Sequence, residues 1–179
     1  MVERLIKEIS VGLHNRCYIS TLTTALTLPD ICGKAMYPNE NKNKARYVQW
    51  LKDYVCMGQP FGLHVDADII YDLRCKLLHE GNPSVAKSKV KQFSLIVREN
   101  SPMGISESVC AEIKLDDSKV WHNYNIDVVL LCNTICEAAL IAFSTNKEKF
   151  DFFDYRITNT DDRTAKAFGL SEDSIKVTL

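Results

Sequence analysis

The chain has 179 residues, of which 46% are apolar and 25% are charged, as in an ordinary globular domain with its own core. Its 22 basic and 23 acidic residues give a net charge of −1. This argues against nucleic-acid binding through a broad basic surface, although a small basic site is compatible with it. Glu3 and Glu8 interrupt the opening segment MVERLIKEIS, so no secretory signal is expected there.

Apolar residues at helical spacing dominate the first half of the chain. They predict helices over residues 2–14, 16–28, about 43–56 and about 66–80. Pro29 is expected to kink or restart the second helix, Gly33 to end it, and residues 38–43 to form a polar loop. The inward faces of the last two helices are expected to comprise Tyr47, Trp50, Leu51, Tyr54 and Val55, and then Ile69, Ile70, Leu73 and Leu77.

Beyond Gly81 the apolar period changes to two, which predicts strands with one buried face. Lys91–Glu99 and Ser108–Asp116 alternate in this way, and Asn100–Gly104 between them favours a hairpin. A third short strand is expected around Val120–Tyr124, and then a long helix from about Asp127 to Lys147, with Asn125 or Ile126 near its start. The predicted fold is mainly α: a bundle of four to five helices with a small antiparallel β-hairpin insertion before the last long helix.

One domain accounts for the whole pattern. We expect a helical domain over residues 1–150, with its β insertion at about 90–124, and a C-terminal extension of the same domain over 151–179, where a short helix near Asp161–Phe168 is one alternative. The longest apolar stretch, 126–143, contains Asp127, Asn133 and Glu137, which would be costly in lipid. It therefore indicates a core helix of a cytoplasmic protein without a membrane span.

The seven cysteines form no CxxC pair, and an odd number without a secretion signal favours buried, reduced thiols. Cys132 and Cys136 lie one helical turn apart and could place two thiolates on one face for zinc. No paired cysteine or histidine motif supplies the further ligands, so two small core residues are the favoured interpretation. No metal and no cofactor is predicted.

The most informative segment runs from Tyr71 to Gly81 and places Arg74 and His79 in an R-x4-H pattern at the end of a helix. Five residues of α-helix correspond to about 7.5 Å of rise and about 140° of rotation. The two side chains therefore do not share one face of a regular helix. They could still converge at a fraying helix end, or more easily when a second copy brings in the same segment.

This segment resembles the motif of the HEPN (higher eukaryotes and prokaryotes nucleotide-binding) superfamily, whose helical bundles carry R-x4–6-H at a comparable place. The LR dipeptide, the apolar spacer and the H-x-G ending fit it, as do the helices around it. Residues 18–47, including LTLPDICG, further resemble bacterial HEPN-like proteins that have this insertion, and the resemblance covers roughly residues 1–147. It implies a metal-independent endoribonuclease, often a toxin or phage-defence protein with an antitoxin partner, whose site lies at a homodimer interface.

The resemblance assigns catalysis to Arg74 and His79. His79 would transfer a proton to or from the RNA 2′-OH or the leaving 5′-oxygen, since the negative end of the helix dipole favours its charged form. Arg74 would hold the phosphate and stabilise its developing charge. The expected products are a 2′,3′-cyclic phosphate and a 5′-OH.

Four more residues are candidates for substrate binding or support of the site. HEPN proteins often have a polar residue on the second helix, and Asp30 fits that place, although a first-turn acid after Pro29 is the alternative. Asp72 would either support His79 or pair with Lys76 at i+4. Cys75 stands where active members often carry Asn, Asp or His, and a thiol is a poor donor. This departure keeps an alternative open: a non-catalytic HEPN-like module that binds a nucleotide or a protein.

Other patterns have simpler interpretations. Cys75 and His79 could form a nucleophilic pair, but no third orienting residue accompanies them, so packing is favoured for Cys75. The segment from His64 to Asp68 has the residue types of a metal site, yet acids are ordinary at a helix start. The basic run Lys87, Lys89 and Lys91 could guide RNA or form a solvated edge, and Trp50 and Trp121 are expected to pack in the core or an interface.

Overall fold

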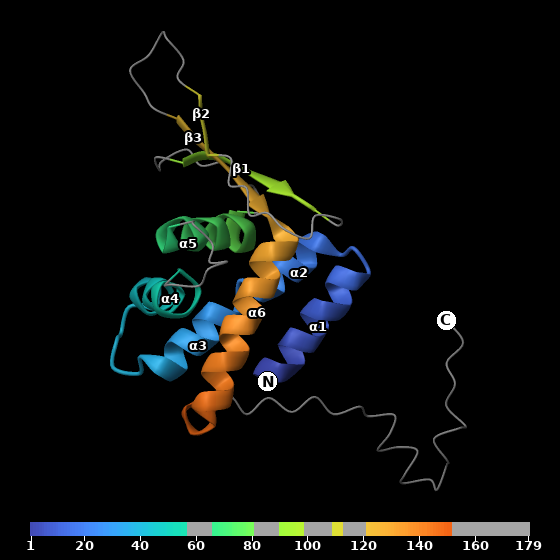
Figure 1. Cartoon of the computed structure of the whole chain (residues 1–179). Coiled ribbons are helices and arrows are strands. Elements are labelled where there is room, and N and C mark those ends of the chain that lie inside the picture. Colours follow the sequence, from blue (N-terminus) through green and yellow to red (C-terminus); the bar gives the residue numbers. More distant parts are fainter. Residues whose placement is uncertain (57–65, 81–89, 99–108, 113–120, 152–179) are drawn as a thin grey trace, which may run out of the picture.

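The computed structural model describes residues 1–56, 66–80, 90–98, 109–112 and 121–151 (Figure 1). Helices make up most of these residues, in agreement with the predicted mainly α class. The elements, in chain order, are α1 (Val2–His14), α2 (Tyr18–Ala25), α3 (Leu28–Met36), α4 (Asn43–Leu51), a π-helical turn η1 (Lys52–Cys56), α5 (Ala67–Cys75), a π-helical turn η2 (Lys76–Glu80), β1 (Val90–Ile96), β2 (Val109–Glu112), β3 (Trp121–Asp127), α6 (Val128–Thr145) and a 3₁₀ turn η3 (Lys147–Phe150).

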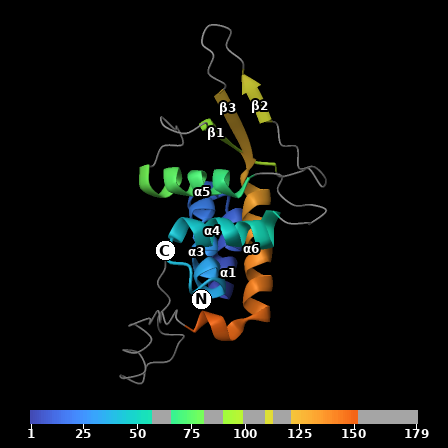
Figure 2. The same cartoon turned by 90° about the vertical axis from the view of Figure 1, so that its left-hand side faces the viewer.

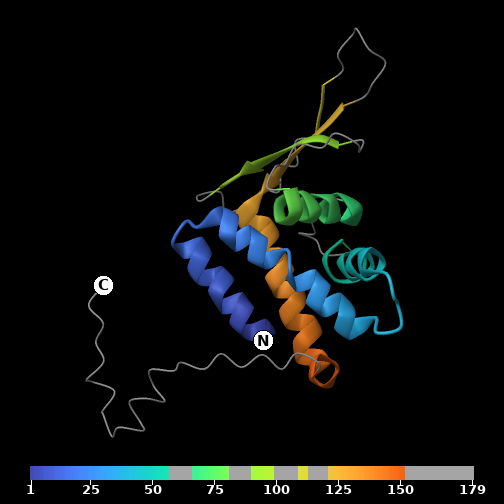
Figure 3. The same cartoon turned by 180° about the vertical axis from the view of Figure 1, so that it is seen from behind.

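Helix α6 is the central element of the bundle and packs against α1, α2, α3 and η1. Seen from behind, α1 and α2 lie on one side of α6, and α3 and α4 on the other (Figure 3). Helix α5 lies between the body of the bundle and the sheet (Figure 2). One apolar core runs from Val2 of α1 to Phe150 of η3, and it includes Ile70 and Leu73 of α5.

Local side chains mark the starts of three helices. The Asp66 carboxylate caps α5 by accepting a hydrogen bond from the Asp68 amide at 3.1 Å. The Asp127 carboxylate caps α6 in the same way through the Leu130 amide, also at 3.1 Å. Pro29 sits in the first turn of α3, where its missing N–H costs nothing, so the chain restarts as a new helix there.

Gly33 does not end its helix, contrary to the prediction. It lies inside α3, which continues to Met36, and it serves the packing of α3 against α4. A Cβ atom at this position would lie 2.9 Å from the Arg46 carbonyl oxygen. The glycine is therefore explained by a close approach of two backbones and not by a left-handed helix end.

The three strands form one sheet in the order β1-β3-β2. The antiparallel pair before the last helix is present, but it joins β2 to β3, with Val109 opposite Tyr124 and Glu112 opposite Trp121. The predicted hairpin between 91–99 and 108–116 is wrong, because β1 pairs with β3 in parallel, from Val90–His122 to Ile96–Asp127. Alternation of apolar and polar residues identifies a segment as a strand but does not determine which strand it pairs with.

Strand β3 lies in the centre of the sheet and continues directly into α6, the helix that packs at the centre of the bundle. Asn125 and Ile126, expected near the start of that helix, belong to β3 instead. Phe93 of β1 and Ile126 of β3 are both buried, which attaches the sheet to the apolar core. The predicted third strand at 120–124 is therefore longer than expected and forms the middle of the sheet.

Within the described residues, α6 alone has the length and apolar composition to cross a membrane. Its packing against three other helices is that of a core helix, with Leu131, Cys132, Ile135 and Ala139 almost fully buried. Trp50 is also fully buried, as predicted, and stacks on Tyr54 with ring centroids 5.6 Å apart. The predicted C-terminal extension from residue 152, Gly81, and the Trp121 side chain lie outside the described residues.

The thiols of Cys32, Cys132 and Cys136 are not in disulfides and lie in or against the core. Burial raises the pKa of Cys32 and of Cys132 to about 12 and that of Cys136 to about 11. Cys136 is close enough to raise the Cys132 pKa further. These thiols are neutral packing residues at neutral pH, as the favoured interpretation holds.

Candidate functional site

An ion pair between two predicted site residues forms the centre of the candidate site. Arg74, in the last turn of α5, donates from Nε and Nη2 to Oδ2 of Asp30, at 3.1 and 2.9 Å. Asp30 lies in the first turn of α3, 44 residues earlier in the chain. The side chains are 20% and 31% exposed, so the pair is shielded from bulk water but reachable from it.

The electrostatic environment keeps Arg74 charged. Burial alone would favour its neutral form, but the Asp30 carboxylate and hydrogen bonds to Asp30 and Cys75 outweigh it, so the pKa of Arg74 is raised. The guanidinium is thus a positive charge that the Asp30 carboxylate holds in place. A fixed, partly desolvated cation suits a phosphate oxygen better than a mobile surface arginine does.

Two tyrosines pack beside this pair. Tyr47 of α4 is fully buried, and its hydroxyl donates to the Leu26 carbonyl oxygen at 3.1 Å. Its ring meets Tyr71 of α5 edge to face, with centroids 5.2 Å apart. Burial, followed by a hydrogen bond to Cys75, raises the pKa of Tyr71. Tyr71 is therefore a neutral, half-buried phenol next to Arg74.

Lys44 of α4 contacts Asp68 and Tyr71 of α5, beside the Asp30–Arg74 pair. Its ammonium lies 2.9 Å from Oδ1 of Asp68 and 5.3 Å from the centre of the Tyr71 ring. The hydrogen bond to Asp68 is the main reason that its pKa is raised. This exposed contact ties the start of α4 to the start of α5.

Asp72, Cys75 and Lys76 are spaced three and four residues apart at the α5–η2 junction, and each is half-buried. Cys75 is near enough to Arg74 and Tyr71 to contribute to the raised pKa of both. Burial raises the pKa of Asp72, and the cations Lys44 and Lys76 counteract this shift. Asp72 thus has Lys76 as an electrostatic neighbour at i+4, one of its two predicted roles.

The spacer between Arg74 and His79 is not a regular α-helix. Residues 76–80 form the π-helical turn η2, in which the hydrogen bonds run from i to i+5. A π-helical turn holds more residues than an α-helical one. Two residues five apart are therefore separated by less than the rotation of about 140° expected for a regular α-helix, and their side chains lie nearer to the same side. His79 lies within η2, and its side chain is outside the described residues.

The sequence did not single out Lys44 and Tyr71 for the site. Tyr71 could have been found, because Tyr71, Arg74 and Cys75 are spaced three and four residues apart on one helix. Lys44 carries no such signal, since it comes from a different helix. Its position depends on how α4 packs against α5.

The other predicted patterns take no part in the described site. Asp66 caps α5 and Asp68 pairs with Lys44, which accounts for two residues of the possible metal segment, while His64 lies outside the described residues. No group of three metal-binding side chains occurs in the ranges that the structure describes. The side chains of Lys87, Lys89 and Lys91 lie outside those ranges.

Comparisons of the chain with protein-family models, with curated proteins and with solved structures give no match.

Proposed function

We propose that the chain is a cytoplasmic, metal-independent endoribonuclease of HEPN type, with a composite site at a homodimer interface. The observation that carries this proposal is the position of Arg74. Its guanidinium is held by Asp30 at one end of a π-helical turn, and His79 lies toward the other end. Single π-helical turns within helices frequently occur at functional sites, because they depart from the more stable α-helical geometry.

Arg74 supplies the electrostatic part of the reaction. Two of its N–H groups donate to one oxygen of Asp30, and the side chain remains partly exposed. A phosphate placed against this cation would be held in position, and the charge that develops on its oxygens would be stabilised. Asp30 acts as a positioning residue, since it fixes the guanidinium without contacting the RNA.

His79 supplies the proton transfers. Removal of the proton from the 2′-OH makes that oxygen a nucleophile, which forms a bond to phosphorus while the bond to the 5′-oxygen breaks. The leaving 5′-oxygen takes up a proton, so the products are a 2′,3′-cyclic phosphate and a 5′-OH. A dimer would place two Arg74 and two His79 side chains along one cleft, and one histidine could then act as base and the other as acid.

A second function competes with this one: a non-catalytic HEPN-like module that binds a nucleotide or a protein. The observation in its favour is that Arg74 is already neutralised by Asp30. Cys75 adds to it, because the thiol contacts Arg74 where active members often have an amide, a carboxylate or an imidazole. Under either function, an antitoxin or another regulatory protein is the expected partner.

The decisive experiment is cleavage of a mixed RNA pool by purified protein in excess EDTA. The wild type, His79→Ala, Arg74→Ala and the control Lys7→Ala are compared, since Lys7 is an exposed residue of α1. Cleavage by the wild type and the control alone, leaving cyclic phosphate ends, supports the ribonuclease. Folded proteins that all fail to cleave support the binding module, and equal cleavage by all four contradicts a role for this motif.

The dimer has its own test. Light scattering measures the mass of the purified protein, and co-expressed Arg74→Ala and His79→Ala chains are assayed together. A composite site predicts that the mixed dimer regains part of the activity, because each chain supplies the residue that the other lacks. A monomeric wild type would contradict a site shared between two copies, and a mixed dimer as inactive as either variant would show that one Arg74 and one His79 do not suffice for cleavage.

A further inference from the structure

Helix α3 begins without a side-chain cap. Its N-cap residue, Thr27, donates its hydroxyl back to the Thr24 carbonyl oxygen at 2.7 Å and caps no amide of α3. The starts of α5 and α6, in contrast, are each capped by an aspartate side chain. Asp30 lies in the first turn of α3, so the position of its carboxylate toward Arg74 depends largely on contacts with other elements.

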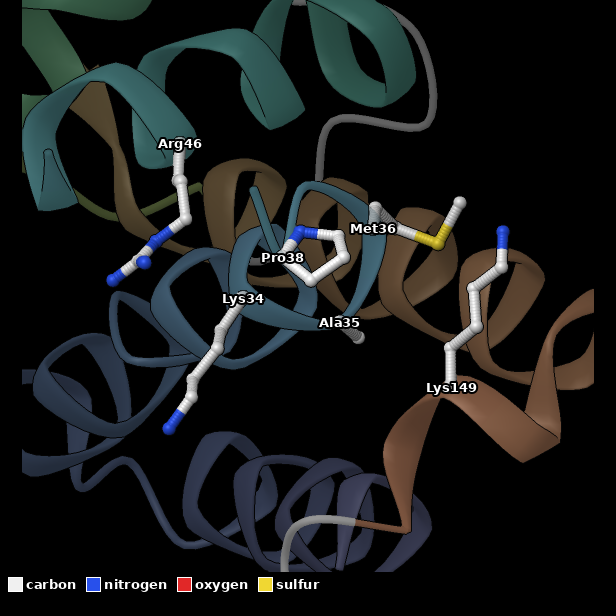
Figure 4. Close-up of a pocket in the computed structure, with 6 residues that line it drawn as sticks. All are labelled: Lys34, Ala35, Met36, Pro38, Arg46 and Lys149. Carbon is white, nitrogen blue, oxygen red and sulfur yellow. The ribbon is translucent and has the colours of Figure 1, made fainter. Parts of the chain in front are cut away.

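The C-terminal end of α3 is loosely packed. A pocket of about 540 Å³ lies there, lined in part by Met36 and Lys149. Figure 4 shows the charged ends of Lys34 and Arg46 pointing away from Lys149, so they do not close this space. Farther back, Gly33 packs closely against the backbone of α4. The alignment of the first turn therefore depends on contacts between Gly33 and the start of the helix.

Tyr47 of α4 contacts the chain just before this uncapped start. Its hydroxyl donates to the Leu26 carbonyl oxygen at 3.1 Å, and both residues are fully buried. Leu26 is the C-cap residue of α2, and the last carbonyls of a helix have no partner within it. Because a buried carbonyl without a donor is costly, this hydrogen bond holds the turn between α2 and α3 against α4.

The ring of the same tyrosine contacts the helix that carries Arg74. It meets the Tyr71 ring edge to face, with centroids 5.2 Å apart. Tyr71 precedes Arg74 by three residues, so the two side chains share one face of α5. Lys44, three residues before Tyr47, places its ammonium 5.3 Å from the centre of the Tyr71 ring. One face of α4 therefore contacts α5 beside Arg74 through two side chains.

Both charges of the ion pair act on Tyr47. Burial is the main reason that the pKa of Tyr47 lies well above its usual value, while Asp30 raises it further and Arg74 lowers it. Tyr47 is therefore close to both partners. Its hydroxyl stays neutral, so it acts by hydrogen bonding and packing and not by titration.

We propose that Tyr47 is the positioning residue of the Asp30–Arg74 pair: its hydroxyl aligns the start of α3, and its ring aligns α5. One buried side chain thus sets the relative position of two residues that are 44 apart in the chain. This role rests on the geometry of the pair and holds whether or not the site cleaves RNA. In the proposed ribonuclease, Tyr47 would not contact the RNA and would act through Asp30 and Arg74.

The test measures the hydrogen exchange of the Arg74 Nε–H group by NMR in the full chain, with the signal assigned from Arg74→Gln. In the wild type this proton is donated to Asp30, and it should exchange more slowly than that of Arg4, whose pair with Glu8 is exposed. Tyr47→Phe keeps the ring and removes only the hydroxyl. It should speed the exchange of the Arg74 proton about fivefold, as weakening of one hydrogen bond implies.

Tyr37→Phe is the matched control. Tyr37 is the C-cap residue of α3, and its hydroxyl donates to Asp53 of η1, so this variant also removes one hydrogen bond that anchors α3. The control should leave the exchange of the Arg74 proton unchanged. This comparison separates positioning of the pair from a general loss of stability.

The ring contact is tested with Tyr71→Phe and Tyr71→Leu. Tyr71→Phe keeps the edge-to-face contact and should exchange as the wild type does, whereas Tyr71→Leu loses it and should exchange as fast as Tyr47→Phe. If Tyr47→Phe does not fold, this second pair decides, and equal exchange in its two members would overturn the role of the ring. A wild-type rate in Tyr47→Phe, or equal acceleration in Tyr37→Phe, would overturn the proposal. No RNA is present in these measurements, so their outcome is independent of the ribonuclease.

Discussion

The pair between Asp30 and Arg74 should stabilise the junction of α3 and α5, and a double-mutant cycle with Asp30→Asn and Arg74→Gln measures its contribution. With side chains 20% and 31% exposed, the pair lies between an exposed ion pair, worth about 0–1 kcal/mol, and a buried one, whose disruption costs about 3–5 kcal/mol. Two N–H groups share one carboxylate oxygen, so we expect a coupling energy of about 1–2 kcal/mol. Urea unfolding of the four proteins gives this value directly.

A matched control exists on α1. Arg4 Nε and Glu8 Oε1 are also 3.1 Å apart, but these side chains are 56% and 54% exposed. The same cycle with Arg4→Gln and Glu8→Gln should give a coupling of only about 0.3–0.5 kcal/mol. If the Asp30–Arg74 coupling is no larger than this control, the carboxylate does not hold the guanidinium, and the argument that Asp30 positions Arg74 fails.

Two further predictions concern packing and thiol chemistry. Gly33→Ala should lower the free energy of unfolding by about 1–3 kcal/mol, because its new Cβ would lie 2.9 Å from the Arg46 carbonyl oxygen; unchanged stability in urea would show that α3 and α4 separate easily. Iodoacetamide at pH 8 should modify exposed Cys17 much faster than buried Cys32, whose pKa of about 12 leaves almost no thiolate until the pH rises toward that value. Peptide mass spectrometry measures both rates, and equal rates would mean that the core opens readily.

Local signals predicted the helices well. Apolar spacing gave α1, α4 and α5 within a few residues, and Pro29 marked the restart between α2 and α3. These signals work because a helix satisfies its own backbone hydrogen bonds and needs only one apolar face for packing. The capping carboxylates Asp66 and Asp127 act within a single turn and are visible in the sequence for the same reason.

Contacts between distant segments were not predictable in this way. Both β1 and β2 alternate, but alternation carries no information on strand order, and β3 lies between them. The change from α- to π-helical hydrogen bonding after Cys75 cannot be seen in the spacing of the apolar residues. It nevertheless alters the rotation about the helix axis between Arg74 and His79. Asp30 was expected near the motif by resemblance, whereas the contribution of Lys44 depends entirely on how two helices pack.

Helix α3 links the Arg74 site to the packing of the bundle. Its first turn holds Asp30 against Arg74, and Gly33 in its second half lies against the backbone of α4. A nine-residue helix is short and stiff, and its distance from α4 is set by the close backbone contact at Gly33. A shift of α3 along α4 would therefore displace Asp30 from Arg74. The orientation of Arg74 thus depends on the packing of α3 against α4, and Gly33→Ala should weaken the Asp30–Arg74 coupling as well as the fold.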